Sequence, residues 1–461
     1  MRISVLGSGP GGYVAAIKAA QLGAQVTVIE KTEVGGTCLN WGCIPTKALV
    51  ASAEMAGKAS KFESYGIELR GEAVPDFSRI ISRKNRIVNT QIKGIKSLFS
   101  SRGIVLKEGH GMLTSPREIS VTLRDGQRER IDADSVIIAT GSKPLQIPYL
   151  PFDGQRILSS DHALMLTEIP KSLIVVGAGV IGCEFACIFS ALGADVTIVE
   201  MLPRALSTED TEISKILERE FRKKKITLLT NIKAEKVDVK EDGIHISFAD
   251  GRKISAEKVL VSAGRLFNSE DIGLEEAGVS KGPCGEIAVN ERMETNVPSV
   301  YAVGDVVGGL LLAHVASAEG ITAVKNIMGG NERIDYASVP NAIFTSPEVA
   351  SVGLREYQAE EKGIKVRTGH MEFRALAKSH TTGEIEGLVK VVADAQSDRI
   401  LGVHIIGPHA SDLIHEAALA VRMGLRTRDI ADTIHAHPTL SEVLMEAAAD
   451  VHKEAIHVIR K

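Results

Sequence analysis

Two cysteines five positions apart could carry thiol–disulfide chemistry. Cys38 and Cys43 lie in the segment GGTCLNWGCIPTK. Five residues of regular helix rise about 7.5 Å, which exceeds the roughly 6.8 Å limit for the α-carbons of a bridged pair. A disulfide here therefore needs a bend in the chain, and Gly42 between the cysteines and Pro45 after them predict one. A strained, partly exposed bridge is of the labile kind that serves in catalysis.

The same pair has two simpler explanations, a pair of buried cysteines that only pack or one half of a metal site. A zinc site would show Cys-x-x-Cys spacing with further cysteine or histidine ligands nearby, and none follows. We therefore predict no metal. Cys183, Cys187 and Cys284 have no comparable setting, and we expect the first two to pack on one helical face.

A glycine-rich pattern occurs twice in the chain, displaced by 170 residues. In each copy Gly-x-Gly-x-x-Gly follows an apolar strand and precedes a helix, a second strand and a terminal glutamate. The segments QLGAQVTVIE and ALGADVTIVE match nearly residue for residue. The residues of the first copy are Gly7, Gly9, Gly12 and Glu30, and those of the second are Gly177, Gly179, Gly182 and Glu200.

This pattern predicts two dinucleotide sites. The first glycine permits a tight turn, the second lets a pyrophosphate approach the backbone, and the third lets the helix pack close on the strand. The helix N-terminus stabilises the anion, and the glutamate accepts hydrogen bonds from the ribose hydroxyls. A glycine-rich turn that packs without a ligand would explain the glycines but not the duplicated acid. Two such sites in one chain suggest an electron-transfer enzyme with one tightly held and one exchanging cofactor.

Further apolar strands divide the chain. Two of them end at corresponding late positions of the repeat, near 139–141 and 262–264, and a third ends in VYAVGD before a helical stretch. We predict an α/β fold with two Rossmann-like dinucleotide-binding domains and a C-terminal α+β domain. A largely helical segment at about 47–100 interrupts the first domain. The predicted boundaries are 1–148 for the first domain, 149–270 for the second, 271–340 for a return to the first, and 341–461 for the C-terminal domain.

Composition narrows the class of protein. Of the 461 residues, 44% are hydrophobic and 24% charged, which excludes intrinsic disorder. The net charge of −4 gives the chain no global electrostatic footprint for nucleic acid. Glycines interrupt every apolar stretch before it is long enough to span a membrane. A strand expected from Ile3 to Leu6 leaves no room for a signal peptide, and five cysteines fit no secreted disulfide framework, so we expect a cytoplasmic protein.

These motifs resemble those of the flavin-dependent pyridine nucleotide-disulfide oxidoreductases. GGTCLNWGCIPTK is similar to the active-site segment of that family. The two glycine motifs, together with IIATGS, YAVGD and HAHPTLSE, extend the resemblance over essentially the whole chain. The resemblance implies FAD in the first domain, NAD in the second, and a C-terminal dimerisation domain that forms a homodimer.

The resemblance also implies the redox roles. Cys38 and Cys43 would form a redox disulfide, with Cys43 against the flavin and Cys38 as the thiol that meets the substrate. His437 would be the general base that accepts the proton of a dithiol, oriented by Glu442. In this family the base and its carboxylate reach the cysteines of the partner subunit, so each active site would need two chains.

Cofactor contacts follow from the same resemblance. Lys47 is similar to the lysine beside the flavin, and Glu184 to the glutamate that pairs with it near the nicotinamide. A surface lysine and an acid that complements a helix dipole are the simpler explanations. Asp305 resembles the aspartate that holds the ribityl chain, and Ala313 and His314 resemble a pair at a helix N-terminus under the ring. The remaining cofactor positions are Gly111, Thr140, Gly141, Ser142 and Gly264.

The activity that the resemblance implies is oxidation of protein-bound dihydrolipoyl groups by NAD. The partners would be lipoyl-bearing proteins of 2-oxoacid dehydrogenase or glycine cleavage complexes. Trp41 departs from the pattern, because many members of the family carry a small aliphatic residue there.

Other activities compete with this one. An NADPH-dependent reductase of glutathione or a similar disulfide would need cations rather than Glu200 at the second ribose. A mercuric reductase would carry a C-terminal cysteine pair, which HKEAIHVIRK lacks, and a soluble transhydrogenase would lack the redox cysteines. A purely structural or redox-sensing subunit would not need every catalytic position that this chain retains.

Overall fold

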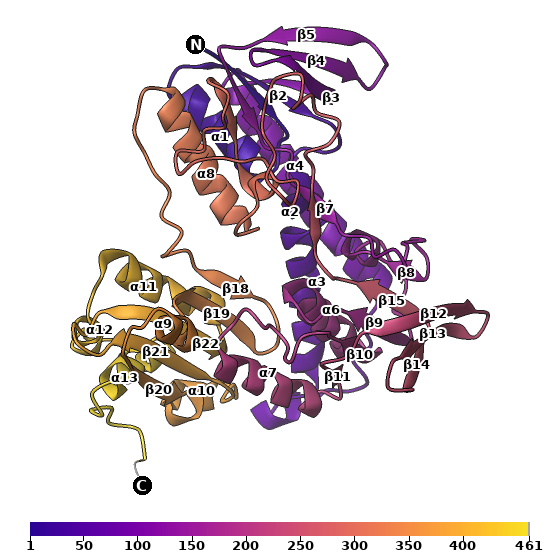
Figure 1. Cartoon of the computed structure of the whole chain (residues 1–461). Helices are drawn as coiled ribbons and strands as arrows, with labels where there is room; N and C mark the ends of the chain where they lie inside the picture. Colours follow the sequence, from indigo (N-terminus) through magenta and orange to yellow (C-terminus); the bar gives the residue numbers. More distant parts are fainter. Residues whose placement is uncertain (460–461) are drawn as a thin grey trace.

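Three β-sheets of five or more strands organise the computed structural model, which describes residues 1–459 (Figure 1). The first sheet combines the beginning of the chain with a strand near residue 300. Its first five strands in spatial order pair in parallel and the last two are antiparallel. The order is β17 (Val300–Ala302), β6 (Ser135–Ile138), β1 (Arg2–Leu6), β2 (Gln25–Glu30), β3 (Val105–Ser115), β4 (Glu118–Leu123) and β5 (Arg128–Asp132).

Two helices with small side chains pack together beside this sheet, α1 (Pro10–Gln21) and α8 (Ala313–Ile327). They approach closely because glycines stand at the contact. A Cβ on Gly320 would lie 2.5 Å from the carbonyl oxygen of Gly11. The 3₁₀ turn η2 (Gly304–Val307) lies between β17 and α8. Because β17 is a strand of the first sheet, the segment after residue 271 returns to that sheet.

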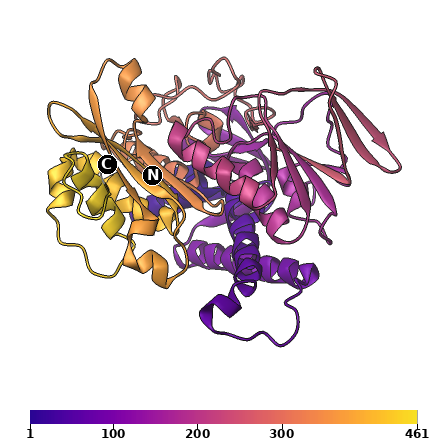
Figure 2. The ribbon, with the colours of Figure 1, turned by 90° about the horizontal axis from the view of Figure 1, so that it is seen from below.

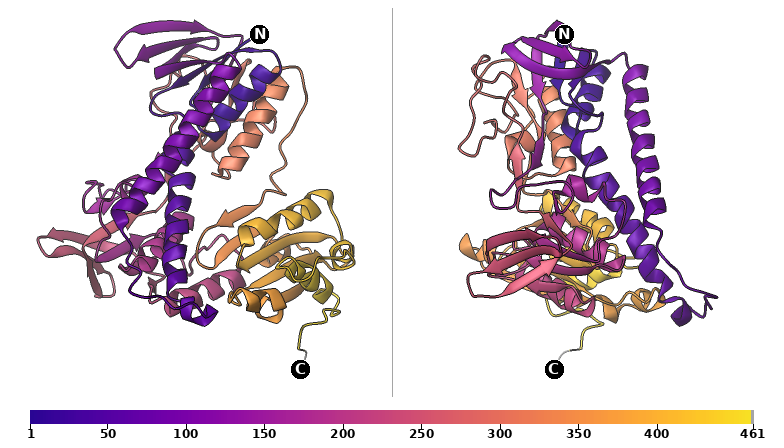
Figure 3. Two further views of the ribbon diagram at one scale, coloured as in Figure 1. Left: turned by 180° about the vertical axis from the view of Figure 1, so that it is seen from behind. Right: turned by 90° about the vertical axis from the view of Figure 1, so that its right-hand side faces the viewer.

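A helical arm leaves the first sheet and reaches the second unit of the chain, which is built on the second sheet described below (Figure 3). It corresponds to the helical segment expected at about 47–100. The last helix of the arm, α4 (Phe77–Ser101), is capped by Asp76, whose side chain accepts a hydrogen bond from the backbone N–H of Arg79. The arm contains α2 (Gly36–Asn40), α3 (Cys43–Ala59), η1 (Phe62–Tyr65) and α4 (Phe77–Ser101).

The second sheet is wholly parallel among its five strands. The order is β11 (Thr227–Leu229), β10 (Asp195–Val199), β9 (Ser172–Val176), β15 (Lys258–Val261) and β8 (Ile157–Leu158). Its helices are α5 (Ser160–Ala163), α6 (Val180–Ala191) and α7 (Thr211–Lys223). Two small antiparallel sheets accompany it, one of β12 (Ala234–Lys240), β13 (Gly243–Phe248) and β14 (Lys253–Ala256), the other of β7 (Ser142–Pro144) and β16 (Arg265–Phe267).

The sequence repeat is also a repeat of strand register. Arg2 is paired with Gln25 between β1 and β2, and Ser172 is paired with Asp195 between β9 and β10. Each residue of the second pair follows its counterpart by 170 positions. The two copies of the motif therefore begin from the same strand geometry.

The third sheet is antiparallel throughout. Helices α11 (Ala410–Met423) and α13 (Glu442–Asp450) pack on one of its faces and α7 of the second unit on the other, as Figure 2 shows for α7. The strand order is β18 (Asn341–Ile343), β19 (Glu348–Gly353), β22 (Ile400–Gly407), β21 (Leu388–Asp394) and β20 (Val366–Glu372). The helices are α9 (Glu356–Glu361), η3 (Phe373–Ala375), α10 (Ala377–Thr381), α11 (Ala410–Met423), α12 (Thr427–Ala431) and α13 (Glu442–Asp450). Across residues 1–459, every helix is too short or too polar to cross a bilayer.

A buried histidine in the third sheet should make stability depend on pH. His404 is 0% exposed, and burial lowers its pKa to about 4 although the Asp210 carboxylate opposes this. Between pH 6.5 and 4 the unfolded chain binds this proton and the folded chain does not, so stability falls as the pH falls. We expect His404 to lower the free energy of unfolding by about 2 kcal/mol between pH 7 and pH 5.

The variant His404→Gln can still donate to the carbonyl oxygen of Leu354, which His404 Nε2 contacts at 3.1 Å. Its unfolding free energy, measured by urea titration, should change less between pH 7 and pH 5 than that of the wild type. The same pH dependence in both proteins would contradict the prediction.

Candidate active site

The chain bends between the two cysteines. Cys38 lies in α2 and Cys43 is the first residue of α3, with Gly42 between the helices in a non-helical conformation. A Cβ on Gly42 would lie 3.0 Å from the carbonyl oxygen of Thr37 and 3.3 Å from the α-carbon of Cys38. The predicted bend at Gly42 is confirmed. Pro45 lies in the first turn of α3, where its missing N–H costs no helical hydrogen bond.

Both cysteines are free thiols in this structure. The Cys38 thiol donates a hydrogen bond to the sulfur of Cys43. This bond lowers the pKa of Cys43 to about 7 against the effect of burial, and the nearby Lys47 ammonium lowers it further. The same bond and burial raise the pKa of Cys38. The first proton to leave the dithiol is therefore that of Cys43.

An ion pair lies one helical turn beyond Cys43. Lys47 Nζ lies 3.0 and 2.8 Å from the two carboxylate oxygens of Glu184, which is 3% exposed on α6. The backbone N–H of Phe344 donates to Glu184 Oε1 at 2.9 Å, and the Phe344 ring centroid lies 4.5 Å from Lys47 Nζ. Lys47 is thus not a plain surface lysine. Glu184 lies in the second turn of its helix, so the helix-dipole explanation is wrong.

Phe344 is a member of this group that sequence reasoning missed. It follows the edge strand β18, about 300 residues after the cysteines, and belongs to none of the motifs. Only the packing of the third sheet against α3 and α6 brings it to the ion pair.

The two glycine motifs leave one open backbone position each. Gly7 and Gly177 have φ of +101° and +105°, and a Cβ on Gly12 would lie 2.0 Å from the carbonyl oxygen of Gly7. The second glycine is different. A Cβ on Gly9 would meet nothing closer than 3.9 Å, and one on Gly179 nothing within 4 Å. The first and third glycines are therefore needed by the fold itself, whereas the second leaves space at a helix N-terminus that fits a pyrophosphate.

The duplicated glutamates make equivalent hydrogen bonds. Glu30 accepts from the backbone N–H groups of Ser8 and Thr32, both at 2.8 Å. Glu200 accepts from the N–H groups of Ala178 at 2.6 Å and Leu202 at 2.7 Å, at the positions displaced by 170 residues. Each acid therefore ties the end of its strand to the glycine turn, a structural role that the sequence argument did not foresee.

Several predicted cofactor positions meet where β6 and β17 end. Ser142 Oγ donates to Asp305 Oδ2, and Arg265 Nε lies 2.6 Å from Ser142 Oγ and 3.7 Å from Asp305 Oδ2. Thr140 Oγ1 donates to the carbonyl oxygen of Asn268 at 2.7 Å, and the side-chain amide of Asn268 donates to the Thr140 carbonyl oxygen at 2.9 Å. Arg265 and Asn268 orient this segment and were not predicted, although Arg265 directly follows the SAG segment.

The other predicted positions are more scattered. Ala313 and His314 begin α8, and His314 Nε2 contacts the Pro340 carbonyl oxygen at 2.8 Å. Gly111 on β3 has a packing reason to be glycine, because a Cβ would lie 2.6 Å from the Leu6 side chain. Gly141 and Gly264 have φ of +70° and +130° and lie in the turns that follow β6 and β15.

The predicted general base lies in the third unit of the chain, which is built on the third sheet. His437 Nδ1 contacts Glu442 Oε1 at 2.9 Å, and Glu442 Oε2 accepts from the backbone N–H of Thr439 at 2.8 Å. Although burial opposes it, these two hydrogen bonds hold the pKa of Glu442 below its usual value. Within residues 1–459 no hydrogen bond or ion pair joins this pair to the cysteines, and α13 lies well apart from α2 and α3 (Figure 1). The His437 side chain is 69% exposed.

The remaining cysteines lie away from the reactive pair. Cys183 and Cys187 are buried on α6, and burial raises the pKa of both, that of Cys187 to about 11. Cys284 is exposed. In the described part of the chain, no three His, Cys, Asp or Glu side chains are grouped so that they could hold a metal ion.

Comparisons with known proteins agree over nearly the whole chain. Residues 1–320 match the family model "Pyridine nucleotide-disulphide oxidoreductase" and residues 339–448 match the model of its dimerisation domain. The dihydrolipoyl dehydrogenase of Bacillus subtilis is 44% identical over 99% of this chain and 98% of its own length. The mitochondrial dihydrolipoyl dehydrogenase 1 of Arabidopsis thaliana is 42% identical over 99% and 91%. Among solved structures, LpdA from Mycobacterium tuberculosis is similar with a TM-score of 0.92, 30% identity, and coverage of 97% of this chain and 99% of that one.

Proposed function

Because the chain belongs to the pyridine nucleotide-disulphide oxidoreductase family, we propose that it oxidises protein-bound dihydrolipoyl groups to lipoyl disulfide with NAD. The observation that carries the proposal is the cysteine pair, in which Cys38 and Lys47 favour a thiolate on Cys43. Relatives named dihydrolipoyl dehydrogenase, at 42–44% identity over 99% of the chain, supply the substrate class.

FAD and NAD are the cofactors of this family, and the residues present fit both. The open backbone at Gly9 and Gly179 fits the two pyrophosphates, and each lies at a helix N-terminus. Asp305, held by Ser142 and Arg265, would bind the ribityl chain of the flavin. When bound, FAD accepts an electron pair from the reduced cysteines and NAD receives it as hydride.

The first step in this mechanism is thiol–disulfide exchange. A substrate thiolate attacks Cys38 Sγ of the oxidised pair, which forms a mixed disulfide and releases the Cys43 thiolate. The second substrate thiolate then attacks the substrate sulfur of the mixed disulfide. Lipoyl disulfide leaves, and Cys38 takes up the proton that the second substrate thiol has lost. The hydrogen bond from the Cys38 thiol to Cys43 is the arrangement that this step produces.

Proton transfer falls to the histidine of the third unit. His437 accepts the proton of the attacking substrate thiol on Nε2, because Nδ1 is held by Glu442. A carboxylate at 2.9 Å stabilises the imidazolium that results. The exposed side chain would act on the cysteines of a second subunit, in a homodimer formed through the dimerisation domain.

The partners proposed are lipoyl-bearing proteins of 2-oxoacid dehydrogenase or glycine cleavage complexes. Location in the cytoplasm remains a prediction from the sparse cysteines, since the named relatives include mitochondrial plant proteins.

The proposal is tested by anaerobic titration with dihydrolipoamide while the flavin spectrum is recorded. Dihydrolipoamide should reduce the enzyme, and NAD added afterwards should reoxidise it with formation of NADH. If glutathione reduces the flavin and dihydrolipoamide does not, the substrate assignment is wrong.

The enzyme should strongly prefer NAD to NADP. Glu200 is fixed by two backbone N–H groups at the end of β10, where it would face a 2′-phosphate as a like charge. Arg204 is the nearest cation in sequence, but its guanidinium donates to the carbonyl oxygens of Ser207 and Glu209 and lies over the Tyr357 ring. Steady-state kcat/KM for the two nucleotides checks this, and equal values would refute it.

A further inference from the structure

A row of polar side chains crosses the third sheet on the face toward the second unit. The paired registers place one such residue on each of the five strands. Their neighbours along the strands are mostly apolar, so the row stands out as a polar line within a packed interface. The row consists of Asn341, Ser351, His404, Lys390 and His370.

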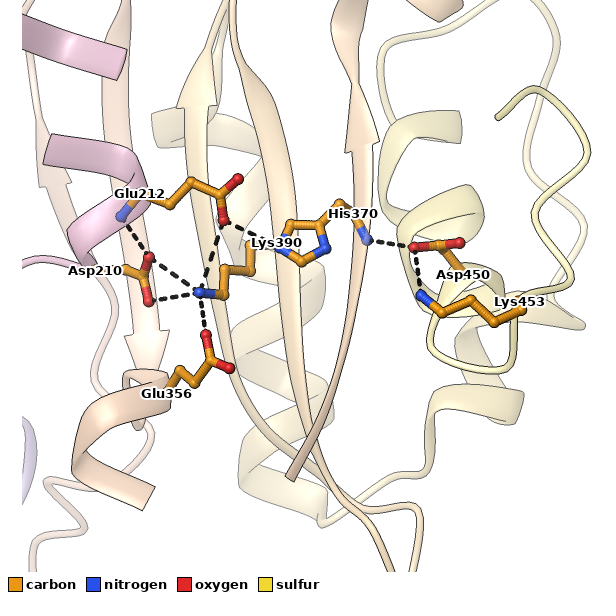
Figure 4. A network of polar contacts seen from close by, with 7 residues as sticks. All are labelled: Asp210, Glu212, Glu356, His370, Lys390, Asp450 and Lys453. Carbon is orange, nitrogen blue, oxygen red and sulfur yellow. Dashed lines mark hydrogen bonds and ion pairs between the residues drawn. The ribbon is translucent and has the colours of Figure 1, made fainter. Parts of the chain in front are cut away.

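Three acids at the start of α7 face this row from the second unit. They are Glu209, Asp210 and Glu212. Lys390 is 4% exposed, and its Nζ lies 3.1 Å from Asp210 and contacts Glu356 of the third unit (Figure 4). His370 Nε2 lies 3.1 Å from Glu212. Hydrogen bonds and charges from Glu356 and Asp210 raise the pKa of Lys390 against the effect of burial. The middle and one end of the row are therefore clamped to the second unit by ionic contacts.

At the other end of the row, Glu209 holds the edge strand β18. Glu209 is 1% exposed, and its Oε1 accepts from Asn341 Nδ2 at 2.9 Å. Arg355 Nη2 lies 3.2 Å from the same oxygen and supplies the counter-charge. Asn341 therefore contributes a partly buried hydrogen bond between the two units without carrying a charge itself.

Three residues after Asn341 the same short segment reaches the ion pair beside the cysteines. The backbone N–H of Phe344 donates to Glu184 and its ring lies under Lys47. The segment has strand partners on one side only, since β18 is the edge of the sheet. Its position relative to α6 therefore depends on contacts outside the sheet, of which the Asn341–Glu209 hydrogen bond is one.

We infer that Asn341 and Glu209 are positioning residues for the nicotinamide step, because they set the place of Phe344 and, through it, of the Lys47–Glu184 pair. The inference rests on the proposed function for the electron transfer between NAD and FAD, and not for the identity of the disulfide substrate. The hydrogen bond from Phe344 to Glu184 can be measured whichever disulfide the enzyme uses.

The variant Asn341→Ala removes the link while Glu209 keeps Arg355 as its partner. Loss of this partly buried hydrogen bond should raise the amide exchange rate of Phe344 by roughly tenfold. Hydrogen exchange detected by mass spectrometry on the 341–346 segment measures this, with or without bound FAD. In stopped-flow experiments, flavin reduction by NADH should slow by a similar factor. Reduction by dihydrolipoamide should slow less, because it depends on the pair only through the smaller effect of Lys47 on the pKa of Cys43.

The matched control is His370→Ala, which removes a contact at the opposite edge of the same row. It should leave both the exchange of Phe344 and the NADH reaction unchanged. Unchanged exchange in Asn341→Ala would overturn the inference. So would equal slowing of both flavin reductions in that variant, because a general loss of structure would then explain it. Reduction by NADH needs no disulfide substrate, so a wrong substrate assignment would not imitate either result.

Discussion

A Cys38→Ser variant should bind FAD and lose dithiol oxidation completely. Without added reductant it should also show a long-wavelength absorption band, from charge transfer between the Cys43 thiolate and the flavin. Dithiol oxidation fails because the sulfur that forms the mixed disulfide is gone. The band is expected because Cys43 can no longer form a disulfide and the cation of Lys47 favours its thiolate. A serine hydroxyl can replace the hydrogen bond that Cys38 now donates to that sulfur.

The visible spectrum of the purified variant, recorded between pH 5 and pH 9, checks this. The band should grow as Cys43 ionises, near its pKa of about 7. Cys43→Ser is the matched control and should show no band, since Cys43 is the sulfur assigned to the flavin and burial still raises the pKa of Cys38. A band in Cys43→Ser instead would reverse the two roles.

A His437→Gln variant should lose dithiol oxidation by a factor of about 10² to 10⁴, the usual contribution of general-base catalysis. Glutamine can keep a hydrogen bond to Glu442 but cannot accept the substrate proton. NADH oxidation by artificial acceptors should survive, because that reaction moves no thiol proton. Steady-state assays of the two reactions on one preparation separate these effects.

Mixed dimers test whether the site is shared between subunits. Cys38→Ser and His437→Gln homodimers are each expected to be inactive with dithiol. Heterodimers formed by refolding the two together should recover one working site, with Cys38 from one chain and His437 from the other. If heterodimers form and the mixture stays inactive, the shared-site proposal is wrong.

The sequence by itself determined the elements whose signals are local. The repeat at 170 residues predicted two equivalent strand–turn–helix units, and the strand registers repeat with the same displacement. The spacing of Cys38 and Cys43 required a bend, and the residue between them with the fewest steric restrictions, Gly42, provides it. Such features could be predicted because backbone sterics and helix rise act over a few residues and leave their pattern in the sequence.

Only the tertiary structure decided how distant residues meet. Lys47 and Glu184 are 137 positions apart, and Phe344 joins them from an edge strand that carries no motif. The polar row across the third sheet exists because five strands pair in one register, and no periodicity along any single strand reveals it. A strand's own pattern specifies which residues share a face, but the partner on the neighbouring strand depends on which strands pair and in what register. The ion pair and the clamp at the start of α7 are therefore products of packing between units, which a one-dimensional pattern does not contain.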